Sequence, residues 1–422
     1  MRSMLQVFSF NVISKGLMGV TGILLIRYMG HIEYAYYTLA ISLVTVVTQA
    51  LTVSFNRLYI VGHANLNLNE STSPFLGFQT AAILALGLLA LPFRGNTGNI
   101  YWFVILASLA TCYSEFSKTF FQEKMKFFRF SMVEVSRTFL TAAGVLLAIF
   151  FLGDKLAAWQ VLSVQAIAMM GIFLIVFGRE LNINKLFRFN GVLKLSSSIV
   201  KGQYRYLFGY FFLFAFFGQM DVFMLRLLTN SSNLAIYGSA FRYYALVILA
   251  LSSVHAVLLP KTQKELNLQK IDATYRKYMK VILLISPVIL LGAYFSQWII
   301  PFLDKGKYPQ AITIFRILAV SSIISLLFSP HVNIVMKFEK FRYLFFLVCG
   351  AIFLSAGMNI ILVPFLGVVG TAISTFISFA FVNGLTYLKS RQVMRQCAYE
   401  NRIPDTAAVV VPEFEPELEQ VS

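Results

Sequence analysis

Long apolar segments recur along the whole 422-residue chain, and they decide its structural class. A helix that rises about 1.5 Å per residue needs about 20 apolar residues to cross a bilayer, and about twelve segments reach that length. Their residues do not alternate as barrel strands would, so helices are predicted. The predicted spans are 8–29, 34–60, 75–93, 100–121, 131–152, 157–178, 205–228, 236–259, 280–302, 310–331, 343–363 and 366–388.

Composition excludes a water-soluble globule. The chain is 58% hydrophobic and only 13% charged, with a mean hydropathy of +0.74. Soluble domains are closer to half apolar and a quarter charged. We therefore expect an all-α, multi-pass membrane protein.

Lysine and arginine are distributed unequally between the two sides of the predicted membrane. With the N-terminus in the cytoplasm, four inner loops hold 18 of these residues and four outer loops hold 4. The inner loops are 122–130, 179–205, 260–280 and 337–342; the outer loops are 94–99, 153–156, 229–235 and 303–309. Because cytoplasmic loops carry the excess of Lys and Arg, both termini are predicted to be cytoplasmic. The net charge of +17 is then a topology signal, and no nucleic-acid partner is expected.

Two stretches about half a chain apart are nearly alike. Phe128–Gly153 and Phe341–Gly367 both begin Phe-Arg-aromatic and both close on Phe-Leu-Gly, and a Tyr-x-x-Ala follows an outer turn at both Tyr37 and Tyr237. The matched spans share a direction, which indicates a parallel duplication of a six-helix unit, as in many transporters. The predicted organisation is two pseudo-symmetric six-helix lobes, 1–178 and 205–388, a cytoplasmic linker, 179–204, and a disordered cytoplasmic tail, 389–422.

Several ionisable residues fall inside the predicted spans, where each costs about 2.5–3.5 kcal/mol and usually faces a cavity or a partner. The acidic ones are Glu115, Glu134 and Asp221, and the basic ones are Lys15, Arg57, Arg137, Arg226, Arg242 and Arg316. Cations therefore outnumber anions. A pathway lined by such residues suits an anionic passenger, and guanidinium is the preferred partner of phosphate because it binds two oxygens at once.

For the Glu134–Arg137 pair, Asp221 and Lys15, a structural role is an alternative to a functional one. Glu134 and Arg137 are three residues apart on one helix face, so a structural ion pair is an alternative. Asp221 either pairs with Arg242 or Arg316 on another helix or has a functional role. Lys15 lies beside three glycines, which mark a face that allows close helix approach or opens onto a cavity.

Signs of catalysis are missing. The chain has no Walker loop and no Asp-x-Asp metal pair, and its four histidines and three cysteines are scattered. The predicted loops are too short for a catalytic domain. We therefore expect a protein that is not an enzyme and that uses no cofactor or metal.

Three segments together resemble a known family. They are "FNVISKGLMGVTGILLIRYMGHIEYAYYTLAISL" (10–43), "MDVFMLRLLTNSSNLAIYGSAFRY" (220–243) and "NIILVPFLGVVGTAISTFIS" (359–378), with its Pro-x-x-Gly-x-x-Gly hinge. With twelve spans, two lobes and short loops, the chain over residues 5–390 resembles the Wzx-type polysaccharide flippases of the multidrug/oligosaccharidyl-lipid/polysaccharide exporter superfamily.

The resemblance implies a function. A flippase of this type would move an undecaprenyl-pyrophosphate-linked oligosaccharide, such as an O-antigen unit, across the bacterial inner membrane by alternating access. The substrate would be bound by Lys15, Arg137, Arg226, Arg242 and Arg316. An H⁺ or Na⁺ gradient would drive transport, with Asp221, Glu115 or Glu134 as candidate coupling carboxylates, since a buried carboxylate can take up and release a proton.

The resemblance also implies partners for the protein and leaves two alternative functions open. Besides membrane lipids, polysaccharide polymerase and chain-length proteins are candidate partners. A multidrug antiporter of the same superfamily is one rival, but it would need acidic residues for cationic drugs. A lipid II flippase is another, although that family usually carries two helices beyond the twelfth.

Overall fold

The structure is a computed structural model. It describes residues 2–53, 56, 72–91, 100–123, 126–177, 204–245, 265 and 267–400. These residues form helices and turns with no strand, so the all-helical prediction is confirmed for them. Within the same residues, eight helices are long and apolar enough to cross a membrane, or nine if one bent pair counts as a single span. The number twelve and the orientation of the termini stay predictions.

All twelve predicted spans overlap described helices. In the first half these are α1 (Arg2–Tyr28), α2 (His31–Thr48) continuing as the π-helix η1 (Gln49–Val53), α4 (Thr72–Ala90), α5 (Ile100–Glu123), α6 (Phe127–Leu152) and α7 (Ala158–Phe177). In the second half they are α9 (Tyr204–Phe217), α10 (Met220–Leu228), helix 231–245, α12 (Leu268–Asp304), α13 (Ala311–Phe328), α15 (Phe341–Leu366) and α16 (Val368–Glu400). The short α14 (Val332–Lys337) follows α13 through a single 3₁₀ turn, η7 (Ser329–His331).

The repeated stretches form matching helices. Both α6 and α15 have 26 residues, and each is followed by a capping glycine with a positive φ, Gly153 with φ 53° and Gly367 with φ 57°. A residue with a Cβ rarely adopts that backbone conformation, which explains why the repeat closes on glycine.

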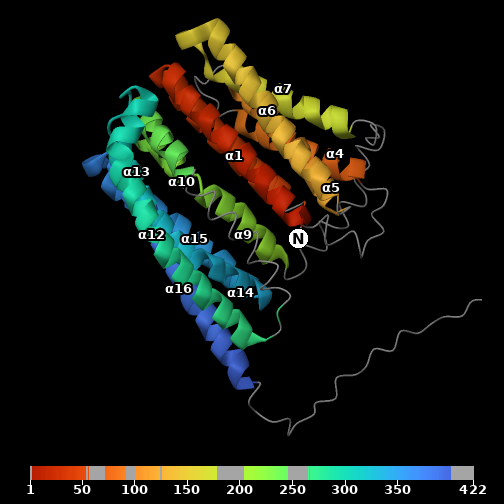
Figure 1. The fold of residues 1–422 in the computed structure, drawn as a ribbon, viewed down its shortest axis with the longest axis vertical. Coiled ribbons are helices and arrows are strands. Elements are labelled where there is room, and N and C mark those ends of the chain that lie inside the picture. Colours follow the sequence, from red (N-terminus) through yellow and green to blue (C-terminus); the bar gives the residue numbers. More distant parts are fainter. Residues whose placement is uncertain are drawn as a thin grey trace, which may run out of the picture.

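The two halves also share a pattern of helix packing. In the first half α1 packs on α6, α5 on α7 and α6 on α7; in the second half α9 and α10 pack on α15, α13 on α16 and α15 on α16. Figure 1 shows α1 to α7 on one side of the molecule and α12 to α16 on the other, with α9 and α10 between them. A duplicated six-helix unit would produce this arrangement.

Two boundaries differ from the prediction. The single predicted span 205–228 is two helices, α9 and α10, bent by 47° at the break between them, where Gly218 and Gln219 lie. The predicted tail from 389 begins instead as helix, because α16 runs on to Glu400. Ser390 and Val393 are buried there, and Arg391 forms an ion pair with Asp272 of α12, so packing continues past the apolar stretch. Residues 401–422 lie outside the described residues.

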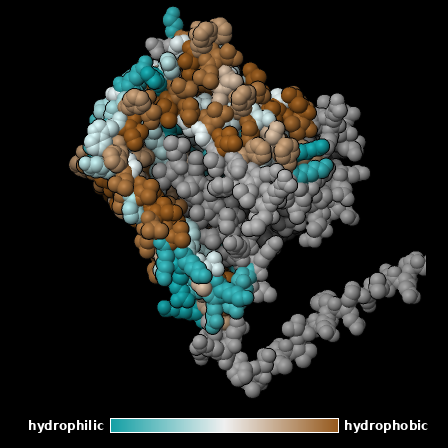
Figure 2. All heavy atoms as spheres, in the orientation of Figure 1, coloured by the Kyte–Doolittle hydropathy of each residue, from teal (hydrophilic) through white to brown (hydrophobic). Residues whose placement is uncertain are grey.

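The surface is what a membrane-spanning bundle requires. Large apolar side chains such as Phe150, Phe353 and Phe365 are more than three-quarters exposed. Figure 2 shows a broad hydrophobic surface, with hydrophilic residues gathered at the end of the molecule where α12 begins and α16 ends. Lys270, Arg276 and other exposed residues of the first turns of α12 contribute to that end. A surface with so many exposed apolar side chains is suited to the hydrocarbon of a lipid bilayer.

The halves touch at the end of the bundle that carries the turns 29–30 and 305–310, here called the Met29 end. Lys307 donates hydrogen bonds to the carbonyl oxygens of Ile26 and Met29. The ring of Tyr308 lies 4.8 Å from that of His31 and 6.0 Å from that of Tyr34. In the predicted topology this end is the outer one.

Deeper along the same contact, Thr38 of α2 packs against Gly238 of helix 231–245. A Cβ on Gly238 would overlap both the hydroxyl and the methyl group of Thr38. The two residues are 200 positions apart, as are the starts of their helices at His31 and 231. Equivalent residues that meet in this way indicate that a pseudo-two-fold axis passes between them.

This contact makes a testable prediction. Gly238→Thr should overpack the contact between Gly238 and Thr38 and lower the free energy of unfolding by about 1–3 kcal/mol. The midpoint of thermal unfolding in detergent should fall accordingly. Exchanging the pair, Thr38→Gly with Gly238→Thr, should recover most of the loss.

The matched control is Gly357→Thr in α15, because a Cβ there would meet nothing within 4 Å. Equal midpoints for Gly238→Thr and Gly357→Thr would show that the halves do not approach each other at this point.

Candidate substrate-binding site

Four charged side chains of α5 and α6 form a closed ring of ion pairs. Lys118 lies 3.0 Å from Glu115 and 2.7 Å from Glu134. Arg137 lies 2.6 Å from both carboxylates. The exposed fraction of these side chains runs from 5% for Glu134 to 30% for Glu115. We call these four residues the ion-pair ring; its charges balance.

Lys15 of α1 adds a positive charge beside this ring. It interacts electrostatically with all four members, most strongly with Glu134. The neighbouring Ser14 bonds to the Thr138 hydroxyl at 2.7 Å, which fixes α1 against α6. Within the described residues, Lys15 has no ion pair or hydrogen bond of its own, so the five groups together carry one excess positive charge.

Arg242 enters the first half from the second. Its guanidinium lies 5.1 Å from the ring centre of Tyr37 on α2 and also interacts with Tyr34. A Cβ on Gly22 of α1 would lie 3.3 Å from Cδ of Arg242, so the missing side chain makes room for it. In the described part of the chain no carboxylate pairs with Arg242, and its buried Nη2 has no hydrogen-bond partner.

Lys15 and Gly22 lie on the same face of α1, because seven residues make about two helical turns. They are about 10 Å apart along the helix axis. The glycine face predicted beside Lys15 therefore serves close approach at Gly22. At Gly16, by contrast, a Cβ would meet nothing within 4 Å. Two cations therefore lie along one face of α1, its own Lys15 and, packed over Gly22, Arg242 of helix 231–245.

Asp221 lies in a cage of hydroxyl groups in the second half. It lies in the first turn of α10, just after the bend, and is 8% exposed. Its Oδ2 accepts hydrogen bonds from Tyr237 at 2.5 Å and from Thr375 of α16 at 2.7 Å. The predicted ion pair with Arg242 or Arg316 is therefore replaced by neutral donors, and Asp221 is a buried carboxylate with no cation partner among the described residues.

The remaining predicted residues lie elsewhere. Arg226 is exposed near the end of α10. Arg316 binds α12, donating to the carbonyl oxygens of Ala293 at 3.0 Å and Tyr294 at 3.3 Å. Arg57 lies outside the described residues. The structure thus brings Lys15, Arg137, Glu115 and Glu134 together, places Arg242 on the same side of α1, and leaves Arg226, Arg316 and Asp221 apart.

Sequence reasoning missed four participants. Lys118 closes the ion-pair ring, and its spacing of three from Glu115 was a usable signal. Tyr237 was noticed as part of the Tyr-x-x-Ala repeat, but no pattern linked it or Thr375 to Asp221. Asp304, at the end of α12, is 1% exposed, and its Oδ2 has no hydrogen-bond partner.

Several solved membrane transporters have the same fold as this chain. The lipid II flippase MurJ in an inward closed conformation aligns with a TM-score of 0.72 at 15% identity, over 92% of this chain and 87% of that one. An inward-facing multidrug resistance MATE family transporter of the MOP superfamily aligns with a TM-score of 0.65 at 15% identity, over 93% and 95%. A MOP superfamily transporter from Pyrococcus furiosus, described as having a binding pocket of reversed polarity, aligns with a TM-score of 0.60 at 14% identity, over 93% of each chain.

These alignments establish that the chain has the fold of MOP superfamily transporters. No protein-family model matches the sequence, and no curated protein is detectably similar to it.

The ion-pair ring makes a prediction about stability. Glu134→Gln should leave Lys118 and Arg137 without one of their two buried carboxylates and cost about 3–5 kcal/mol. Glu115→Gln should cost less, because that carboxylate is more exposed and water screens it. Thermal unfolding of the purified variants measures both, and a larger loss for Glu115→Gln would contradict this account of the ring.

Proposed function

We propose that this protein is a flippase that moves an undecaprenyl-pyrophosphate-linked oligosaccharide, such as an O-antigen unit, across the bacterial inner membrane by alternating access. The observation that carries the proposal is Arg242, a half-buried residue whose Nη2 is fully buried where the two halves meet and which no carboxylate pairs with in the described residues. Burying a charge without a counter-ion costs free energy. An anionic substrate that binds to Arg242 would offset that cost.

The position of Arg242 fits an alternating mechanism. In this conformation the halves are joined at the Met29 end, and Arg242 packs on Tyr37 deeper along the same contact. Separation of the halves at that end would free the guanidinium, whose planar fork suits the two oxygens of a phosphate. Lys15, about 10 Å further along the same face of α1, would meet the passenger from the other side of the membrane.

The same charges argue against a multidrug antiporter. A cavity for cationic drugs needs exposed negative charge. Here Glu115 and Glu134 are each neutralised by two cations, and Asp221 is enclosed by Tyr237 and Thr375. A lipid II flippase would use the same cationic groups to bind phosphate. The two functions therefore differ in which glycan the lipid carries, and not in how its phosphate is bound.

Asp221 is the proposed coupling residue. Both of its partners are neutral hydroxyl groups, and Tyr237 belongs to helix 231–245, which also carries Arg242. Gain or loss of a proton at Asp221 would change these hydrogen bonds and so bias the position of that helix. Glu115 and Glu134, held in the ion-pair ring, are weaker candidates.

Loss of the Arg242 charge should abolish transport. In a host that depends on this protein, Arg242→Ala should remove surface glycan and cause lipid-linked oligosaccharide to accumulate on the inner leaflet. Arg242→Lys should retain part of the activity, because the charge is kept and only the bidentate fork is lost. Glycan display and protein abundance are measured together.

The matched control is Arg276→Ala on α12, a residue 65% exposed that pairs with Asp272. Normal glycan display by abundant Arg242→Ala protein would refute a binding role.

The coupling role of Asp221 predicts a change in pH dependence. Asp221→Asn keeps the shape of the side chain and its contacts with Tyr237 and Thr375 but removes the titrating group. Transport by the purified variant in proteoliposomes should lose its response to a pH gradient. If the variant responds as the unmodified protein does, Asp221 is structural.

A further inference from the structure

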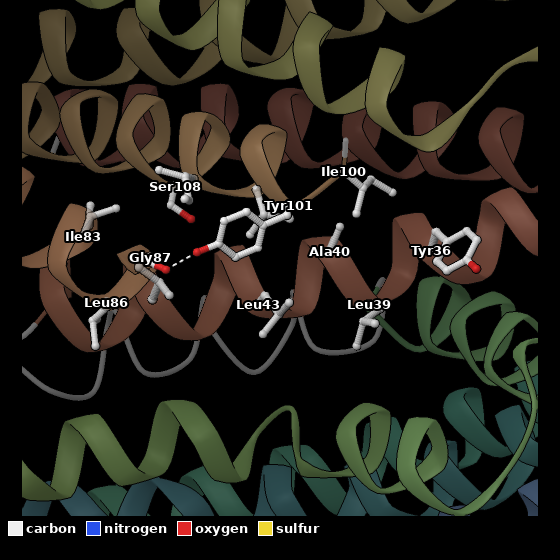
Figure 3. A pocket seen from close by; sticks show the side chains of 13 residues that line it. Tyr36, Leu39, Ala40, Leu43, Ile83, Leu86, Gly87, Ile100, Tyr101 and Ser108 are labelled. Atoms are coloured by element: carbon white, nitrogen blue, oxygen red, sulfur yellow. Dashed lines mark hydrogen bonds between the residues drawn. The ribbon is translucent and has the colours of Figure 1, made fainter. Parts of the chain in front are cut away.

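A small apolar cavity lies inside the first half, between α2, α4 and α5. Its volume is about 140 Å³, and Leu39, Ala40, Leu43, Ile83, Leu86 and Val104 are among its lining residues. Figure 3 shows Ala40 and Ile100 bordering it, with the Tyr101 hydroxyl turned to the carbonyl oxygen of Gly87. Because that hydroxyl already donates a hydrogen bond, a ligand in the cavity would contact mostly hydrocarbon.

The size and lining of the cavity define the ligand chemistry. Apolar cavities of about 150 Å³ stay dry and take up hydrocarbons as large as benzene. This cavity therefore holds about five or six carbons, the size of one branched isoprene unit. Water would find too few polar partners there.

The cavity is accessible from the side. Two of its lining residues, Leu43 and Leu86, are 38% and 40% exposed, whereas Ala40 and Ile83 at its base are each 2% exposed. The lining residues of α2 fall between Tyr36 and Val47, inside an apolar helix long enough to cross a membrane. The exposed apolar side chains of Leu43 and Leu86 therefore form a mouth through which an apolar chain could enter the cavity.

The cavity and the buried guanidinium occupy two faces of one helix. Tyr36 lines the cavity, and the next residue, Tyr37, packs against Arg242. Consecutive residues of a helix point about 100° apart, so the apolar site and the cation lie on different faces of α2. A lipid with an anionic head group and a long apolar chain could engage both faces at once.

We infer that this cavity between α2, α4 and α5 binds part of the isoprenoid chain of the transported lipid. The inference rests on the proposed function and adds a place for the chain of the substrate. The chain would be held at the depth of the leaflet next to the Met29 end while the phosphate is released from Arg242.

Site-specific photo-crosslinking tests this directly. Benzoylphenylalanine placed at Leu86 should crosslink clickable undecaprenyl phosphate several-fold more than the same probe at Leu147. Leu147 is a matched control because it is 59% exposed on α6 and lies a similar distance from the end of its helix. A clickable phosphatidylglycerol should label both positions alike. Equal polyprenyl labelling at both positions, or preferential phosphatidylglycerol labelling at Leu86, would overturn the inference.

Filling the cavity provides a second measurement. Ala40→Leu should lower polyprenyl crosslinking at Leu86 several-fold and leave crosslinking at Leu147 unchanged. Val222→Leu, at a buried position outside the cavity, controls for general loss of packing. Undiminished crosslinking at Leu86 in folded Ala40→Leu protein would also overturn the inference.

The outcomes separate this inference from the proposed function. If the protein flips the glycan lipid but Leu86 shows no polyprenyl preference, the cavity has no part in binding the chain and the flippase proposal stands. If Leu86 shows that preference but no glycan lipid is flipped, the cavity binds polyprenyl chains and the flippase proposal fails.

Discussion

An unpaired cation in the interior of a membrane protein is the interaction on which this account depends. Burying a charge without a counter-ion is unfavourable, so charged residues within a membrane usually mark functional sites. Arg242 is half-buried, with its Nη2 fully buried, beside the Tyr37 ring and over a glycine that makes room for it, at the contact between the halves. Attraction to the Tyr37 ring offsets part of the cost. The rest would be recovered when an anion reaches the guanidinium.

Comparison of the halves shows where two buried charged residues break their pseudo-symmetry. Residues 200 positions apart are equivalent near the contact between halves, as Thr38 and Gly238 demonstrate. By that offset Arg242 corresponds to Ser42 and Asp221 to Thr21, both small, neutral and buried. The second half thus has a cation and a carboxylate at positions where the first half has hydroxyl groups. These two positions are therefore where the charges of the halves differ.

The sequence predicted the fold better than it predicted the site. Apolar length located the helices, because hydrocarbon admits few alternatives to a helix. It failed at Gly218, where a bend is invisible to hydropathy, and at residue 389, where burial of Ser390 and Val393 continues α16. Spacing along one helix found the pair Glu134–Arg137. The cage around Asp221 joins residues 16 and 154 positions away, and such contacts depend on helix packing that no local pattern encodes.

The central claim is that the cationic contact between the halves serves an anionic lipid. The most direct measurement uses purified protein in proteoliposomes, with an undecaprenyl-pyrophosphate-linked oligosaccharide placed in one leaflet and its appearance in the other followed by lectin binding. In parallel, vesicles loaded with a cationic dye report drug transport. The account predicts protein-dependent appearance of the glycan lipid and no dye movement. Dye transport without movement of the glycan lipid would contradict it.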